Sequence, residues 1–216
     1  PVFSNIILAD EINRTPPKTQ AALLEAMQEN KVTTGGKTYD LDNPFFVLAT
    51  QNPIEQEGTY PLPEAQLDRF MFNILIDYPS FKEEQDIVKA NTTSIKQKLN
   101  NVITKQELID FQKLVRDIPI ADNVIEYAVN LSHKTRPINE CPEITKKYIE
   151  WGAGPRSSSF LILAAKAGAI LKGEPTPNID DIKKIAKPVL RHRIILNFNA
   201  EAEGIKTDDI LEQLID

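Results

Sequence analysis

Two adjacent carboxylates, Asp10 and Glu11, directly follow the apolar run at residues 6–9. A short continuous apolar run is typical of a strand that is buried on both faces, as in a parallel sheet. Because open α/β sheets bind ligands at the carboxyl ends of their strands, we expect both acids at such an edge. One carboxylate could hold hydrated Mg²⁺, and the other could orient and polarise an attacking water, as nucleotide hydrolysis requires. A solvated acidic turn is the alternative, and this pair alone does not exclude it.

The elements that would position these acids alternate between strands and helices in the first third of the chain. Turn residues, apolar runs and a Gly-Gly pair predict a helix over 18–29, a β-hairpin over 31–34 and 37–41, strands over 44–50 and 70–76, and a short helix over 64–69. The rest of the chain predicts helices over 82–91, 104–116, 122–134, 157–172 and 179–191, and a final helix after residue 207. The expected N-caps of three of these helices are Thr104, Asn178 and Thr207. We therefore expect an α/β domain at residues 1–79 and a helical domain at 80–216.

Composition narrows the class of protein. The chain has 216 residues, enough for one large or two small domains, and a formal charge of −6, which argues against nonspecific nucleic-acid binding. A local basic patch has helical spacing that favours a solvated helix face; it comprises Lys183, Lys184, Lys187, Arg191 and Arg193. The single cysteine, Cys141, excludes an internal disulfide framework and fits a reducing, cytoplasmic compartment. No apolar run is long enough to span a membrane, and no signal peptide is visible.

Four segments, read in order, carry a family resemblance. They are LADEINR at residues 8–14, FVLATQNPIE at 46–55, GTYPLPEAQLDRF at 58–70 and WGAGPR at 151–156. Together they resemble the MoxR family of AAA+ ATPases, from the Walker B strand to the end of the helical lid. The resemblance implies an α/β fold: a partial AAA+ P-loop NTPase core with strands 3, 4 and 5 of the parallel sheet, followed by an all-helical lid domain.

The same resemblance implies roles at the strand ends. Asp10 corresponds to the Walker B acid, which holds Mg²⁺ through water, and Glu11 to the base that polarises the attacking water. Asn52 is similar to sensor 1, whose amide could hold that water or an oxygen of the γ-phosphate of ATP. An Asx turn before Pro53 is the alternative for Asn52.

Two arginines complete the implied site. Arg69 matches the arginine finger, which acts on the nucleotide of a neighbouring subunit; its alternative is a surface ion pair with Asp68 or Glu64. Arg156 matches the sensor 2 arginine, which reaches from the lid to the γ-phosphate; its alternative is an exposed residue in the first turn of a helix. The hairpin around Gly35 resembles the pre-sensor-1 hairpin of this family. The alternative, which the sequence supports equally well, is an ordinary hairpin at the edge of the fold.

One expected feature is missing from the printed sequence. It contains no Gly-x-x-x-x-Gly-Lys-Ser/Thr, the Walker A loop that cradles phosphates. In the usual strand order 5-1-4-3-2, strand 1 would lie between strands 4 and 5, so this chain alone leaves a gap in the sheet. We therefore expect the functional protein to be longer and these 216 residues alone to bind ATP poorly.

The implied function is an ATP-hydrolysing, chaperone-like ATPase that forms a ring, expected to be a hexamer. Family partners include proteins with von Willebrand factor A domains, and the family's role is assembly or maturation of partner proteins. Two alternatives stay open: a non-catalytic interaction module that lacks a P-loop, and a magnesium-chelatase-like AAA+ subunit. The coding sequence upstream of Pro1 would separate the first alternative from an ATPase, since only the ATPase requires a Walker A loop there.

Overall fold

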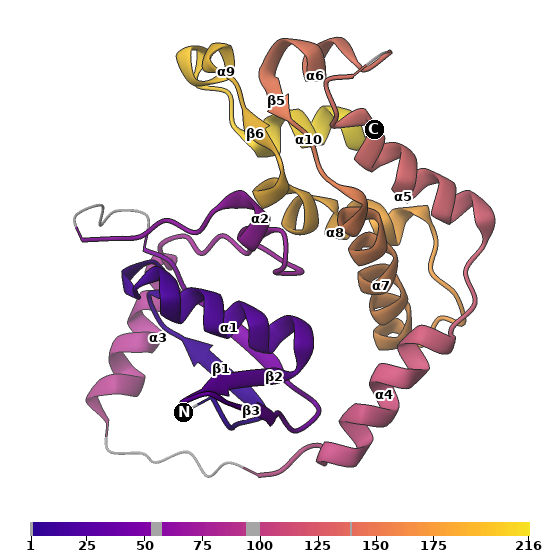
Figure 1. Ribbon diagram of the computed structural model, residues 1–216. Helices are drawn as coiled ribbons and strands as arrows, with labels where there is room; N and C mark the ends of the chain where they lie inside the picture. Colours follow the sequence, from indigo (N-terminus) through magenta and orange to yellow (C-terminus); the bar gives the residue numbers. More distant parts are fainter. Residues whose placement is uncertain (1, 53–57, 94–99, 139) are drawn as a thin grey trace.

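The computed structural model describes residues 2–52, 58–93, 100–138 and 140–216. Its first third forms a small α/β unit and its last half a bundle of helices, with the short helix α2 (Glu64–Leu67) between them (Figure 1). The elements of the α/β unit are β1 (Ile6–Ala9), α1 (Pro17–Glu29), β2 (Lys31–Thr34), β3 (Lys37–Asp40) and β4 (Phe46–Ala49). Those after α2 are α3 (Phe81–Thr92), α4 (Lys105–Asp117), α5 (Asp122–Lys134), α6 (Glu143–Tyr148), β5 (Ile149–Trp151), α7 (Pro155–Lys172), α8 (Ile179–Leu190), β6 (Ile195–Leu196), α9 (Phe198–Glu203) and α10 (Thr207–Ile215). None of the described helices is long and apolar enough to cross a membrane.

The parallel pair β1 and β4 forms the sheet that the apolar runs predict. Its register runs from Ile6 opposite Phe46 to Ala9 opposite Ala49. Ala9 and Ala49 pack on the cluster formed by Ile12 with residues of α1 and of the loop before α2. The carboxyl ends of both strands therefore meet at one edge of the sheet, as expected.

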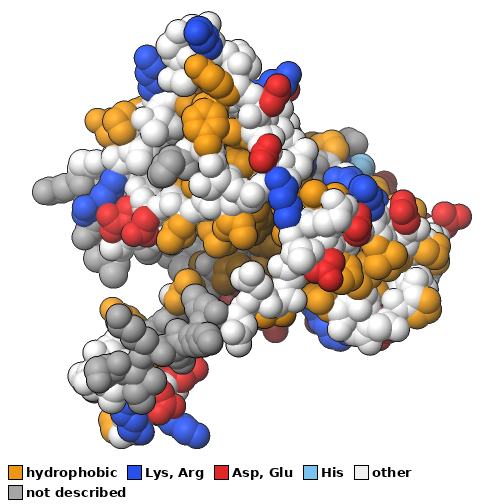
Figure 2. Space-filling model, turned by 90° about the horizontal axis from the view of Figure 1, so that it is seen from below, with side chains coloured by type: hydrophobic (Ala, Val, Ile, Leu, Met, Phe, Trp, Pro, Cys, Tyr) orange, Lys and Arg blue, Asp and Glu red, His pale blue; other side chains and the backbone are white. Residues whose placement is uncertain are grey.

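The prediction that β1 is buried on both faces is wrong. Residues alternate along each strand, so that every second side chain lies on the face away from α1. Those outward side chains are half to two-thirds exposed: Ile6 61%, Leu8 63%, Phe46 54% and Leu48 49%. Within the described chain only one face of the sheet receives a covering helix. Other hydrophobic side chains that are open to solvent appear in orange on the face shown in Figure 2.

The prediction of a third strand over residues 70–76 is also wrong. This segment is extended but joins no sheet, and the backbone N–H of Asn73 donates to the carbonyl of Pro188 in the lid, at 2.8 Å. A strand needs a neighbouring edge for its backbone groups. In the strand order of the family that edge belongs to strand 1, which the described chain does not supply. The segment therefore packs on the lid and leaves Ile74 and Ile76 exposed.

The predicted hairpin is confirmed. β2 and β3 pair antiparallel, with Thr34 opposite Lys37, and Gly35 and Gly36 both have positive φ, as a tight two-residue turn requires. The ring of Tyr39 lies edge-to-face on Phe3, with the ring centroids 5.8 Å apart.

The lid is built around one apolar cluster from α5, α7, α8 and α10. As expected, α7 is its centre, because it packs against α4, α5 and α8. The predicted N-caps are confirmed at Thr104 and Asn178, whose side chains accept from the backbone N–H three residues later. The prediction of Thr207 as the cap of the last helix is wrong, since Thr207 is the first residue of α10 and Lys206 is its N-cap. The expectation of an all-helical lid needs correction, since β5 and β6 pair antiparallel within it. The segments are two and three residues long, too short for period-two alternation to be recognised.

The division after residue 79 stays a prediction. The helix that follows it, α3, begins with a capping box at Ser80, but all of its residues are exposed. It therefore belongs to none of the three buried apolar clusters, one in the lid and two in the α/β unit, that would define domains here.

Candidate functional site

A cluster of three residues forms where β1 and β4 end, and we call it the strand-edge cluster: Asp10, Glu11 and Thr50. The Thr50 hydroxyl donates to Asp10 Oδ1 at 2.6 Å and accepts from the backbone N–H of Glu11 at 2.8 Å. The backbone of Thr50 also bonds across the edge, from its N–H to the Ala9 carbonyl (3.0 Å) and from its carbonyl to the N–H of Ile12 (3.0 Å). The two acids are thus fixed to the strand end that leads, two residues later, to Asn52.

Glu11 has a backbone conformation that ordinary residues avoid. Its φ and ψ are 47° and 53°, in the left-handed region, where a residue with a Cβ is uncommon and costs of order 1 kcal/mol or more. The bonds that Thr50 makes on both sides of Glu11 maintain this conformation. Its carboxylate forms an ion pair with Arg14 at 3.2 Å, both side chains being partly exposed. Strained residues of this kind gather at functional sites.

The chemistry of the strand-edge cluster fits magnesium. No group of three or more potential metal ligands occurs among the described residues, so a cage made wholly of protein is not formed there. Mg²⁺ does not require one, since it keeps several waters and binds one or two carboxylates together with substrate phosphates. Asp10, whose Oδ1 is oriented by Thr50, is the carboxylate that would hold it.

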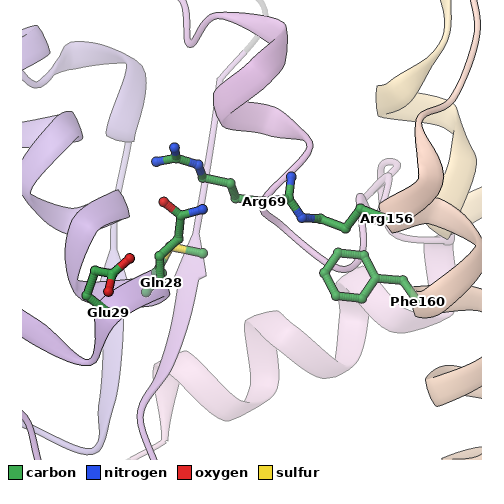
Figure 3. A pocket seen from close by; sticks show the side chains of 6 residues that line it. Gln28, Glu29, Arg69, Arg156 and Phe160 are labelled. Carbon is green, nitrogen blue, oxygen red and sulfur yellow. The ribbon is translucent and has the colours of Figure 1, made fainter.

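The two predicted arginines meet in a second place, which we call the arginine cavity. It has a volume of about 330 Å³ and is lined by Met27, Gln28, Glu29, Arg69, Arg156 and Phe160. Figure 3 shows Arg69, from the segment after α2, and Arg156, from the first turn of α7, in the lining of this cavity, with the Arg69 side chain extending towards Gln28. A planar guanidinium can bind phosphate oxygens through two parallel hydrogen bonds, so a pair of them here suits a phosphate group.

The contacts of Asp68 distinguish the nucleotide-binding roles implied for Arg69 and Arg156 from their alternatives, a surface ion pair and an exposed first-turn residue. Its carboxylate accepts from Arg156 Nη1 and, at 2.9 Å, from Arg193 Nε. No ion pair involves Arg69 within the described ranges, so the surface pair with Asp68 or Glu64 is not formed. Arg156 is not simply an exposed first-turn residue either, because it is bound to Asp68.

The strand-edge cluster and the arginine cavity lie at opposite ends of α1. Asp10 and Glu11 precede the start of this helix, whereas Met27, Gln28 and Glu29 form its end. The residues that line the arginine cavity do not include Asp10, Glu11 or Thr50. The structure therefore unites the two acids with the strand end near Asn52, and unites the two arginines, but separates these two groups from each other.

The predicted solvated basic patch on α8 is wrong at its last two members. Arg191 has 15% of its side chain exposed and pairs with Asp208. Arg193 has only 1% of its side chain exposed, and its guanidinium carbon lies 5.1 Å from the centre of the Phe160 ring. The preceding His192 is largely buried, and burial first and then the Arg193 charge lower its pKa to about 4. Helical spacing could not reveal this, since α8 ends at Leu190 and a 3-10 turn over Arg191–Arg193 redirects the side chains.

Three residues near the predicted site were not assigned a role there from sequence: Thr50, Asp68 and Arg193. Thr50 stands at the end of a predicted strand beside two acids, and Asp68 directly precedes Arg69; adjacency was their only signal. Arg193 had none, because its partners on either side of Arg69 are more than 120 positions away.

Comparison with known proteins gives the same identity at both ends of the chain. Residues 1–72 match the family described as "ATPase family associated with various cellular activities (AAA)", and residues 142–214 match the AAA lid domain. The whole chain is 45% identical to the uncharacterised protein YeaC of Bacillus subtilis and 39% identical to Chaperone MoxR1 of Mycobacterium tuberculosis, and covers 65% and 57% of their lengths. It thus spans roughly three-fifths of these curated relatives.

A solved structure agrees with these sequence matches. The crystal structure of a proposed ATPase from Cytophaga hutchinsonii superimposes with a TM-score of 0.92 at 43% identity, over all of this chain and 66% of that one. The matches to the AAA family and to its lid domain, together with the relatives named MoxR, lead to one conclusion. The chain belongs to the MoxR family of AAA+ ATPases.

Proposed function

We propose that this chain is part of a MoxR-type ATPase that hydrolyses ATP and assists the assembly or maturation of partner proteins. The observation that carries this proposal is the strand-edge cluster, in which one hydroxyl fixes both adjacent acids at the carboxyl end of a parallel strand. The relative named Chaperone MoxR1 supports the chaperone-like part.

In this proposal Asp10, Glu11 and Asn52 have different roles in ATP hydrolysis. Asp10 would hold Mg²⁺, which when bound offsets negative charge on the phosphates. Glu11 orients and polarises the water that attacks the γ-phosphate, once its carboxylate turns from Arg14 to that water. Asn52, beyond the end of β4, positions the same water or a γ-phosphate oxygen through its amide.

We infer that Arg69 and Arg156 both act on the nucleotide of a neighbouring subunit. Arg69 matches the arginine finger, which acts across a subunit boundary, and both arginines line one cavity that none of the residues of the strand-edge cluster lines. Each site would then combine acids from one subunit with arginines from the next. Head-to-tail contacts between subunits produce either closed rings or open filaments, and we propose a closed ring, a hexamer, for this protein.

The test is Glu11→Gln in the full-length protein. Glutamine keeps the shape of the side chain but is a far weaker base, so turnover should fall about 100-fold or more while ATP affinity is retained. Steady-state hydrolysis and equilibrium binding of ATP measure the two effects. Unchanged turnover would remove Glu11 from its role and, with it, the proposed reaction.

The same variant addresses the partners. A protein that binds ATP without hydrolysing it should accumulate in its ATP-bound assembly, and isolation of that assembly would identify the client. We propose a cytoplasmic location, and a protein with a von Willebrand factor A domain as one partner. Recovery of magnesium-chelatase components instead would favour the chelatase-like alternative.

A further inference from the structure

Arg193 connects the lid to the short segment that carries Arg69. Its Nη2 donates to the carbonyls of Asp68 (2.9 Å) and Phe70 (2.6 Å), and its Nη1 donates to the carbonyl of Met71 (3.4 Å). These carbonyls flank Arg69 on both sides. A buried guanidinium therefore fixes the backbone on each side of Arg69 and sets the direction in which that side chain leaves the chain.

The same guanidinium acts on Arg156 through Asp68. Arg193 Nε binds Asp68 Oδ1, and Arg156 Nη1 binds Asp68 Oδ2, so that the carboxylate is shared by the two arginines. Arg193 is almost fully buried, whereas Arg156 is 42% exposed at the rim of the arginine cavity. The buried partner is the anchor of this arrangement and the exposed one is the group available to a ligand.

Few other side chains could make these contacts. The planar fork of arginine has five N–H donors in fixed directions, and here they serve one carboxylate and four carbonyls, that of Val189 included. Phe160, which also lines the arginine cavity, covers the face of the guanidinium. A lysine at this position would keep the charge but could not bind Asp68 and both sides of Arg69 together.

We propose that Arg193 is a positioning residue, which holds Arg69 and Arg156 in one cavity by binding Asp68 and the carbonyls that flank Arg69. This inference rests on the proposed role of both arginines at the phosphate of a neighbouring subunit. In this proposal Arg193, a residue of the lid, does not contact the nucleotide itself. It determines the positions of the two arginines that bind the transferred phosphate.

The experiment compares Arg193→Gln and Arg193→Lys with Arg69→Ala and Arg156→Ala in the full-length protein. Misplacing catalytic groups by about 1 Å costs on the order of 100-fold in rate, so kcat of both Arg193 variants should fall towards that of the alanine variants. The KM for ATP should change less than about three-fold, since binding at Asp10 is intact. Arg191→Gln is the matched control, because it removes an arginine of the same turn that pairs with Asp208 and donates to the Asn73 carbonyl, rather than to Asp68 or the carbonyls next to Arg69.

Mixed rings separate positioning from a purely structural role. Chains carrying Arg193→Gln keep Glu11, and chains carrying Glu11→Gln keep their arginines, so alternating subunits should recover turnover that neither variant has alone. A general loss of folding would not be recovered in this way. If Arg193→Gln does not fold, Asp68→Asn breaks the same link at a 25% exposed carboxylate and should be recovered by the same partner.

Each outcome has a defined meaning. Full turnover of the Arg193 and Asp68 variants, with Arg69→Ala and Arg156→Ala inactive, would overturn the positioning inference and leave the proposed function intact. Full turnover of the two alanine variants would overturn the proposed role of the cavity. Recovery of Arg69→Ala but not of Arg193→Gln or Asp68→Asn in mixed rings would reduce Arg193 to a folding contact.

Discussion

Thr50 shows how much of the strand-edge cluster depends on one side chain. Sequence predicted the two acids and Asn52 but not the hydroxyl that binds Asp10 and the Glu11 backbone. Replacement of that hydroxyl removes one hydrogen bond to a charged group and one that keeps Glu11 in its unusual conformation.

We therefore predict that Thr50→Val lowers kcat about ten-fold, which corresponds to about 1.4 kcal/mol in the transition state. Thr50→Ser, which keeps the hydroxyl, should retain most of the activity. Initial-rate measurements at saturating ATP on both full-length variants test this. Equal rates for valine and serine would mean that the hydroxyl has no part in orienting the acids.

His192 gives a second prediction at this scale. Its pKa is about 4 in the folded chain, because of burial and then Arg193, against about 6.5 when unfolded. The unfolded state therefore binds more protons between these values, and the folded state is favoured above pH 6.5 and loses stability as the pH falls. From pH 7 to pH 5 the loss amounts to about 2 kcal/mol.

Urea unfolding of wild type and His192→Gln at the two pH values isolates this effect, because carboxylates with lowered pKa, such as Glu83 and Glu107, contribute equally to both. Stability should fall about 2 kcal/mol further in the wild type than in the variant. If the unfolding free energy depends on pH equally in both proteins, His192 is protonated in the folded chain without a loss of stability, which would contradict the prediction.

Among the elements, sequence predicted best those that local chemistry determines. The hairpin follows from Gly35 and Gly36, and the starts of α4 and α8 follow from the capping residues Thr104 and Asn178. Elements that depend on distant partners were predicted badly. The segment over 70–76 has the composition of a strand but no neighbouring strand to pair with, and the two strands of the lid are too short to leave a pattern.

The site follows the same division. Motif residues at the strand ends were placed correctly at one edge, because parallel strands bring their carboxyl ends together. The meeting of Arg69 with Arg156, and the burial of Arg193 beside them, depend on how the lid packs against α2. No periodicity along the sequence contains that information.

Gly152 tests the packing of the lid. A Cβ at this position would lie 2.3 Å from the carbonyl oxygen of Thr135, and both are backbone positions that other contacts fix, such as the bond from the Ala153 N–H to Thr135 Oγ1. Gly152→Ala should destabilise the chain by about 3 kcal/mol. Gly168→Ala, where a Cβ meets nothing within 4 Å in α7, should be stabilising by up to about 1 kcal/mol. Thermal unfolding by circular dichroism compares the two, and equal melting temperatures would contradict the close approach.

The molecule as a whole consists of a large lid core and a thin α/β unit. The lid has one continuous buried cluster, whereas the α/β unit has two small ones and a sheet of two strands. Asp68 and the carbonyls after it connect the two parts through Arg193. A rotation of the lid relative to the α/β unit would therefore change the positions of Arg69 and Arg156 first.

The outward face of the β1–β4 sheet has a practical consequence. Leu8 is 63% exposed there, so Leu8→Lys should alter the unfolding free energy of these 216 residues by no more than about 0.5 kcal/mol. Parallel sheets in complete proteins are covered on both sides, and an unpaired ammonium trapped beneath a second layer costs several kcal/mol. Leu8→Lys should therefore leave the melting temperature of the 216-residue chain almost unchanged and lower that of the full-length protein strongly. Melting curves of the two proteins, each with and without the substitution, would show whether a further layer covers this face.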